Sequence, residues 1–252
     1  MQFVSCYNMG NFSIIVATIL LLSSCNSSEI TERYNNGQKK EEKVYIKSKS
    51  DYTLIRYFQN GQKSFEGKIE NNLFVNKKTS YFENGQISQV DSLFKPCILN
   101  FCCCDGLVTR FRENGIIEET FTNINGVENG IVRVYDTLGK LEFEYMMRKG
   151  KKNGLFKTYF VNGNISFKAT FKNDTIIGYA LYLKENGDTL KMMKYNGEQM
   201  DFPYFKWLEN GQILKGELTN NGRQALWSWM DKNRKIIKKE VVNFDKEVVA
   251  PE

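Results

Sequence analysis

Histidine is absent from this chain of 252 residues. Its absence removes the commonest general base and the commonest metal ligand of proteins. Proline occurs only 3 times, whereas aromatic residues make up 13% of the chain, a balance that favours β-structure over a helical bundle. The G-x-S-x-G elbow, the phosphate-binding loop and the metalloprotease helix motif are also missing. We therefore expect neither catalysis nor a bound cofactor or metal.

Charge of one sign is not concentrated anywhere in the chain. The net charge of +6 is spread over 35 basic and 29 acidic residues, without a block long enough for a nucleic-acid arm. Interspersed charge is typical of a solvated surface, so no nucleic-acid partner is expected. The acid pairs Glu41-Glu42 and Glu118-Glu119 lie in polar stretches. We expect these carboxylates to be solvated.

Long hydrophobic runs are lacking too, since the apolar run from Phe12 to Leu22 has only eleven residues. That is too short to span a bilayer as a helix but suits the core of a signal peptide. The following Leu22-Ser23-Ser24-Cys25 resembles the lipobox of bacterial lipoproteins. The resemblance implies removal of residues 1–24 and lipidation of Cys25. Because Lys and Arg are absent before Phe12, a short buried element ending in an ordinary core cysteine is the alternative.

Asn26 rather than aspartate follows Cys25, so the resemblance carries no signal for retention in the inner membrane. It implies anchoring to the outer membrane of a Gram-negative bacterium, on its periplasmic or surface face. Several acyl chains on one cysteine would hold the protein firmly, since one chain alone anchors only marginally.

One phrase recurs along most of the chain, with a glycine at its centre. Successive glycines are 24 residues apart except for one gap of 30, and a ninth copy, "DKNRKI", carries Arg234 instead of glycine. A period this regular identifies a repeat array with one insertion. All but one of the glycines follow Asn, and they are Gly37, Gly61, Gly85, Gly115, Gly139, Gly163, Gly187 and Gly211.

Asn-Gly between apolar stretches predicts a β-hairpin in each copy. The position four before glycine holds Tyr57, Tyr81, Phe111, Tyr135, Tyr159, Leu183 and Trp207. The position two after glycine holds Lys63, Ile87, Ile117, Leu141, Ile165, Thr189 and Ile213. Only a three-residue loop with a type I turn and a glycine bulge sets these two columns opposite each other, so we predict that register. The aromatic column is either a binding face or, as is more usual for aromatic stripes, a packing feature.

A second glycine column lies nine residues before the first, at Gly106, Gly130, Gly154 and Gly178. Pairs such as Gly126/Gly130 and Gly150/Gly154 predict tight reversals between hairpins. The predicted fold is all-β, an elongated antiparallel meander of about sixteen strands in one solenoid-like layer of stacked hairpins. We assign residues 25–50 to a tether and divergent first repeat, 51–240 to the array, and 241–252 to a C-terminal tail.

The phrase resembles the bacterial variant of the membrane occupation and recognition nexus (MORN) repeat. It reads aromatic, two residues, Asn-Gly, a polar residue and an aliphatic, as in "YFENGQI" (Tyr81–Ile87), "YFVNGNI" (Tyr159–Ile165) and "WLENGQI" (Trp207–Ile213). The resemblance covers Tyr52 to Ile237 and implies binding, with a protein as the partner. Bacterial proteins with such repeats are often labelled antitoxins, and eukaryotic relatives are scaffolds at membranes. A lipid-anchored scaffold and an antitoxin or immunity protein are therefore the two functional hypotheses.

The insertion, at residues 95–105, contains four cysteines: Cys97, Cys102, Cys103 and Cys104. Three consecutive cysteines do not easily direct their thiolates at one ion, because neighbours along a strand point to opposite faces. An exported chain would favour a disulfide of Cys97 with Cys102 or Cys104. Free or buried thiols and a metal site are the alternatives.

Overall fold

The computed structural model describes residues 27–98, 104–197, 199–219 and 224–243. These residues form one open antiparallel sheet of 20 strands without a helix, which confirms the predicted fold class. The strands are β1 Ser28–Arg33, β2 Lys39–Ser48, β3 Asp51–Tyr57, β4 Lys63–Glu70, β5 Leu73–Tyr81, β6 Ile87–Leu93, β7 Cys97–Ile98, β8 Gly106–Phe111, β9 Ile117–Ile124, β10 Val127–Glu128, β11 Gly130–Tyr135, β12 Leu141–Arg148, β13 Lys151–Tyr159, β14 Ile165–Lys172, β15 Thr175–Leu183, β16 Thr189–Asn196, β17 Gln199–Trp207, β18 Ile213–Thr219, β19 Gln224–Met230 and β20 Ile236–Asn243.

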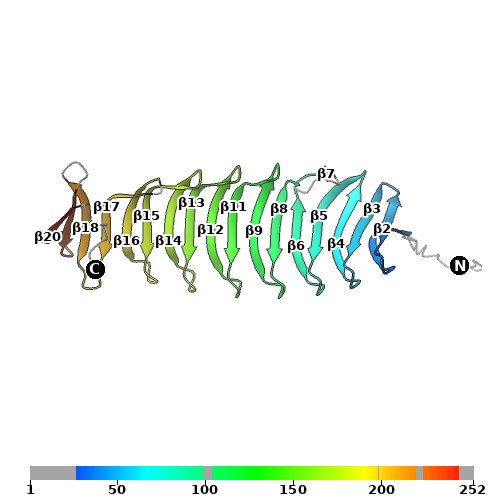
Figure 1. Ribbon diagram of the computed structural model, residues 1–252, viewed down its shortest axis with the longest axis horizontal. Helices are drawn as coiled ribbons and strands as arrows, with labels where there is room; N and C mark the ends of the chain where they lie inside the picture. Colours follow the sequence, from blue (N-terminus) through cyan, green and yellow to red (C-terminus); the bar gives the residue numbers. More distant parts are fainter. Residues whose placement is uncertain (1–26, 99–103, 198, 220–223, 244–252) are drawn as a thin grey trace, which may run out of the picture.

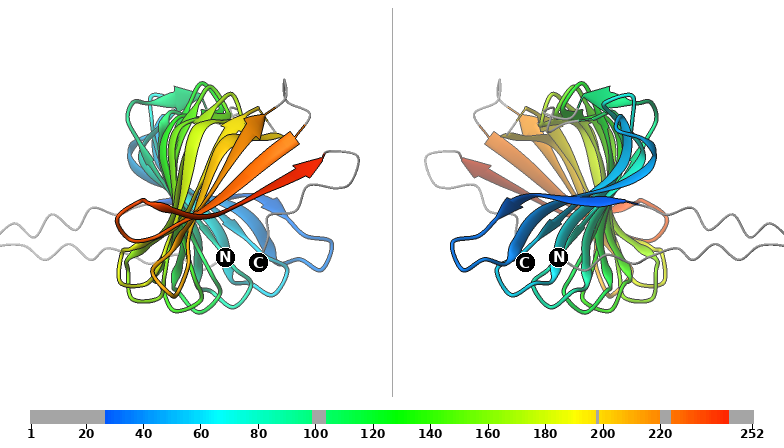
Figure 2. Two further views of the ribbon diagram at one scale, coloured as in Figure 1. Left: turned by 90° about the vertical axis from the view of Figure 1, so that its left-hand side faces the viewer. Right: turned by 90° about the vertical axis from the view of Figure 1, so that its right-hand side faces the viewer.

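The strands follow one another across the sheet nearly in chain order. Figure 1 shows them as a long row with β2 near one end and β20 at the other. The two short strands β7 and β10 lie beside β5 and β9, so β6 pairs with β8 and β9 with β11. The copy around Arg234 also forms a hairpin, β19–β20. This ninth hairpin and the two short strands explain why there are 20 strands rather than sixteen. Figure 2 shows the twist expected of such a sheet.

The hairpins at one end of the strands have the predicted bulged turn. In the second copy the Gly61 amide donates to the Phe58 carbonyl (3.0 Å), and the Phe58 amide donates to the Gln62 carbonyl (2.8 Å). Gly61 has φ +85°, and Tyr57 lies opposite Lys63. The same pairing, four before glycine with two after, recurs in the other copies, so the bulged register is confirmed.

At the other end of the strands, two-residue turns join successive hairpins. Both central residues have positive φ in the turns Asn71–Asn72, Asn125–Gly126, Lys149–Gly150 and Asn173–Asp174, as type I′ turns require. The prediction for the second glycine column was wrong in part, because Gly126 and Gly150 occupy turns but Gly130 and Gly154 do not.

Gly154 lies within β13, at a bulge. Tyr145 pairs with Phe156 and Met147 with Lys152, so β13 contains two more residues than β12 over this stretch. The φ of +127° at Gly154 suits glycine, and an added Cβ would lie 3.0 Å from Met146 Cβ. A bulge bends its strand and increases the local twist. At Gly154, the second glycine column therefore marks a bend within a strand rather than a reversal.

Three hydrophobic clusters lie along one face of the sheet, which we call the core face. They are formed by Tyr52, Leu54, Ile69 and Phe74, then by Val108, Phe121 and Val132, and finally by Tyr204, Leu214, Ala225 and Trp227. Trp227 is fully buried and lies over Gly216, where an added Cβ would come within 2.6 Å of the indole. Glycine at position 216 is therefore required by the packing of Trp227.

We predict that Gly163→Val destabilises the protein more than Gly37→Val. Both glycines have φ near +85° and open space around a built Cβ, so the local strain is similar, about 1 kcal/mol. The hairpin of Gly163 supports neighbours on both sides, whereas that of Gly37 lies at the end of the array. Hydrogen exchange should show a loss of protection centred on β13 and β14.

Gly163→Asn is the matched control, because asparagine tolerates positive φ better than valine does. It should leave protection of β13 and β14 nearly intact. Uniform loss of protection over all strands in Gly163→Val would instead mean that the array unfolds as one cooperative unit. Equal tolerance of valine at both positions would contradict the role given to the bulged turn.

Candidate binding surface

The predicted aromatic and aliphatic columns lie on the face of the sheet opposite the core face. Side chains alternate along a strand, so Leu54 on the core face places Tyr57 on the other side. Each aromatic residue pairs with its aliphatic or polar counterpart, and all members of the aromatic column are half-buried. We call this surface, which also carries Tyr81, Phe111, Tyr135, Tyr159 and Trp207, the tyrosine face.

At the N-terminal end of the tyrosine face, Tyr57 is bound to a carboxylate of its own chain. Its hydroxyl donates to Glu42 Oε2 (2.7 Å), which also lies 3.0 Å from Lys39 Nζ. Burial and this hydrogen bond raise the pKa of Tyr57 to about 12. The same bond and Lys39 lower the pKa of Glu42. Glu42 is only 7% exposed, so the expectation that it is solvated was wrong.

The next unit repeats this arrangement more loosely. Lys63 Nζ lies 2.8 Å from Glu66 Oε2, and the Tyr81 hydroxyl lies 3.5 Å from the same oxygen. Burial, followed by the charge of Glu66, raises the pKa of Tyr81. At these two positions the aromatic column joins neighbouring hairpins, which is the packing role.

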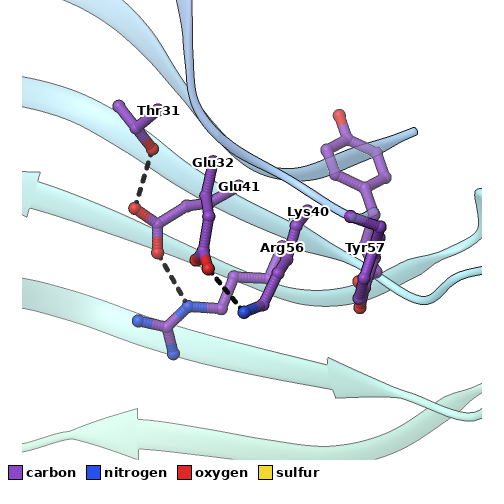
Figure 3. Close-up of polar contacts among 7 residues, drawn as sticks. Thr31, Glu32, Lys40, Glu41, Arg56 and Tyr57 are labelled. Carbon is purple, nitrogen blue, oxygen red and sulfur yellow. Dashed lines mark hydrogen bonds and ion pairs between the residues drawn. The ribbon is translucent and has the colours of Figure 1, made fainter. Parts of the chain in front are cut away.

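Ionic contacts also join β1 to the array, as Figure 3 shows. Glu41 accepts hydrogen bonds from Thr31 Oγ1 (2.9 Å) and Arg56 Nε (3.0 Å), while Lys40 pairs with Glu32. Burial raises the pKa of Glu41, but the bonds from Arg56 and Thr31 outweigh it and leave that pKa lowered. Glu41 thus links three strands and, like Glu42, is not simply solvated.

The middle of the tyrosine face is ionic as well. Glu144 lies between two cations, 2.9 Å from Arg133 Nε and 3.2 Å from Lys157 Nζ. The hydrogen bond to Glu144 raises the pKa of Lys157. Glu42, Glu66 and Glu144 all stand five residues after the repeat glycine. In these three copies, the column therefore supplies a carboxylate to the face.

Near the C-terminal end the same columns become apolar and enclose a pocket. The position five after Gly187 holds Met192, and the aromatic position holds Trp207, which has no hydroxyl. The pocket has a volume of about 360 Å³, and its lining is Met192, Phe205, Trp207, Ile213, Lys215, Met230 and Arg234. We call it the Trp207 pocket. Phe205 and Trp207 lie with ring centroids 6.2 Å apart, and Lys215 Nζ is 6.0 Å from the Phe205 ring.

Only Trp207 and Ile213 of this lining stood in the two columns singled out from the sequence. Met230 was missed although it occupies the aromatic position of the ninth copy, four before Arg234. Met192 was missed because the column five after glycine was not compared across copies. That column reads Glu42, Glu66, Val90, Thr120, Glu144, Lys168 and Met192 in successive copies, so methionine at this position was the available signal.

The core face carries an aromatic cluster that the sequence reasoning also missed. Phe156 contacts four rings at centroid distances of 5.4–6.3 Å, those of Phe143, Tyr145, Phe167 and Phe171. Lys152 Nζ lies 5.4–5.7 Å from the rings of Tyr145, Phe156 and Phe171. Such cation–π contacts stabilise the middle of the array. The signal was the even spacing of aromatic residues along two of these strands, with Phe143 and Tyr145 two apart and Phe167 and Phe171 four apart.

In the insertion, a disulfide joins Cys97 to Cys104, one of the two pairings left open by the sequence. Cys97 lies in β7 opposite Phe74 and packs against the core cluster of Tyr52. Cys102 and Cys103 lie outside the described residues, as does Cys25. Within the described ranges, no three His, Cys, Asp or Glu side chains are grouped as a metal site.

Comparison with known families gives one match. A family model described as the MORN repeat variant matches residues 152–173, a span that covers nearly all of β13 and β14. This segment contains one bulged hairpin of the array, and the match suggests a binding or scaffold role. A search of curated proteins found no match. Among the residues that the structure describes, none forms a helix with the length and hydropathy of a membrane span.

We predict that Tyr57→Phe lowers the free energy of unfolding by about 1–3 kcal/mol, since it removes a hydrogen bond to a buried carboxylate. Tyr81→Phe is the matched control, because its hydroxyl lies 3.5 Å from Glu66 and contributes less. Urea unfolding of both variants measures the difference. Equal losses in the two variants would contradict the stabilising role of the Tyr57–Glu42 contact.

Proposed function

We propose that the protein is a non-catalytic binding scaffold, lipid-anchored through Cys25 in the envelope of a Gram-negative bacterium, and that the Trp207 pocket receives a side chain of a protein partner. The observation that carries the proposal is the difference along the tyrosine face between its ionic contacts and a pocket lined mainly by apolar side chains. The MORN repeat variant in the array agrees with a binding role.

The composition of the pocket favours a protein partner. Trp, Met and Arg are enriched in protein interfaces, and tryptophan is a frequent hot spot. Met192 and Met230 supply adaptable apolar contacts. Lys215 and Arg234 add positive charge to the lining. This chemistry suits a segment with an apolar side chain beside an acidic residue.

The position of β1 determines where a lipid anchor at Cys25 would place the array relative to the membrane. Ser27, the first described residue, follows Cys25 by two positions, so their Cα atoms lie within about 7 Å of each other. A lipidated Cys25 would therefore hold β1 close to the membrane surface. The Trp207 pocket lies fourteen pairings along the row from β1, about 65 Å at the usual strand spacing. The array would act as a spacer that presents the pocket away from the anchor.

A toxin is one partner that would fit the same pocket, and the chain would then be an antitoxin or immunity protein. A toxin gene beside the gene for this protein distinguishes that case from an envelope scaffold. Both cases require a protein bound at the pocket, so both depend on the experiment that follows.

We expect a photo-crosslinking residue at position 207 to capture one protein species from detergent-solubilised envelope. The same residue at position 135, in the ionic middle of the aromatic column, should not capture that species. Once the partner is purified, Trp207→Ala should weaken its binding at least about 30-fold, as for an interface hot spot. Met192→Gln should weaken binding too, since it makes the pocket polar at nearly constant volume. Equal capture from both positions, or unchanged affinity in both variants, would refute the pocket as the binding site.

The lipid anchor is tested separately. Cys25→Ala should release the protein from membranes and block cleavage before position 25, because the lipobox cysteine is both the acylated residue and the new amino terminus. Membrane fractionation and amino-terminal sequencing measure the two effects. Membrane association and an unshortened amino terminus in both forms would rule out the lipoprotein.

A further inference from the structure

The open sheet ends in two edge strands, β1 and β20. β20 pairs with β19 on one side, and no described strand pairs with its other side. The same holds for β1, which pairs with β2 alone. An unpaired strand edge presents a row of backbone N–H and C=O groups that can pair with another strand.

The two edges differ in how well they could accept a strand. β1 has six residues, its register with β2 is irregular at two places, and it carries Glu29, Glu32 and Arg33. Short length and irregular register discourage edge pairing and distinguish β1 from β20, since β20 also carries charged residues, Lys238, Lys239 and Glu240. β20 pairs regularly with β19 from Lys238 to Asn243. Three of its apolar side chains are exposed, Ile236 by 47%, Ile237 by 56% and Val241 by 55%.

We propose that β20 pairs antiparallel with β20 of a second copy of this chain, so that the two arrays form one continuous sheet. A twofold axis perpendicular to the sheet relates such strands and keeps every side chain on its own face. Residues directly opposite each other must therefore come from the same face, which means that the pairing is centred on a single residue.

Centring the pairing on Lys239 gives complementary charges. Lys238 then lies opposite Glu240 of the second copy, and by symmetry Glu240 lies opposite that copy's Lys238. Lys238 and Glu240 already share a face, since Lys238 Nζ is 3.2 Å from Glu240 Oε2 within the strand. Opposite charges directly across strands stabilise a sheet. In the same register Ile237 lies opposite the second copy's Val241.

The neighbouring register is less favourable. Centring on Glu240 places two glutamates opposite each other and sets Lys238 opposite Val242, so both ion pairs are lost. The favoured register has one unfavourable contact, because Lys239 faces the second copy's Lys239. This proposal is independent of the Trp207 pocket. A dimer would nevertheless bring two such pockets near its centre, and a partner with two epitopes would bind the dimer more tightly than the monomer.

Sedimentation equilibrium of the full chain over a range of concentrations tests the proposal. The wild type should show a monomer–dimer equilibrium. Glu240→Lys should raise the dissociation constant at least about tenfold, because four lysines then face one another. The double variant with Lys238→Glu and Glu240→Lys should restore dimerisation, since it exchanges the charges and rebuilds both pairs. Lys239→Thr should lower the dissociation constant, because it removes the like-charge contact.

Glu142→Lys is the matched control, an exposed residue of β12 whose replacement changes the net charge equally. It should leave the dissociation constant unchanged. Glu240 and Lys239 are exposed, so all variants should fold, which circular dichroism checks. A monomer at every concentration would overturn the proposal, and so would a dimer that Glu240→Lys leaves intact. A double variant as weak as Glu240→Lys would overturn the register centred on Lys239.

Discussion

The structure depends on the bulged turn that recurs every 24 residues. Its third loop residue has positive φ, which is why the position is glycine in eight copies and why Arg234 takes φ +61° in the ninth. Because the loop length sets the register, each copy places the same columns opposite each other. A slip of one residue would transfer the apolar set of a strand to the wrong face. Regular turns therefore align the columns into continuous rows along the sheet.

Because the columns are aligned, the core face and the tyrosine face of the sheet can have different roles. On the core face, bulges bend the strands and close packing buries Ile69, Leu214 and Trp227, although the sheet has a single layer. On the tyrosine face, the column five after glycine holds acidic, apolar, polar and basic residues in different copies while the hairpin stays the same, as Glu144, Lys168 and Met192 show. The turns and the core face are common to the copies, so the contacts on the tyrosine face can differ from copy to copy.

Most of the fold could be predicted because its signal is local and repeated. The Asn-Gly turns, the glycine period and the aromatic and aliphatic columns were sufficient for the all-β meander and its register. Features that depend on several strands at once were missed. A glycine such as Gly154 can occupy a bulge as well as a turn, and its sequence context does not distinguish the two. The burial of Glu42 depends on Tyr57, which lies on a neighbouring hairpin. Within the candidate site, Trp207 was found as a member of a column, whereas Met192 and Met230 were recognised only through the pocket.

In an array of this kind, the position of a pocket and the chemistry of its lining are set by different features of the sequence. Each added copy moves the next hairpin along the row by two strand spacings, about 10 Å, without altering the copies before it. The distance between the N-terminal strands and the Trp207 pocket is therefore set by the number of copies, and the chemistry of the pocket by substitutions at a few column positions. The ionic copies between them hold neighbouring hairpins together through contacts such as Tyr57–Glu42 and Arg133–Glu144–Lys157. In those copies the polar groups are paired within the chain, whereas near β17 Met192, Trp207 and Met230 line a pocket in which apolar side chains predominate.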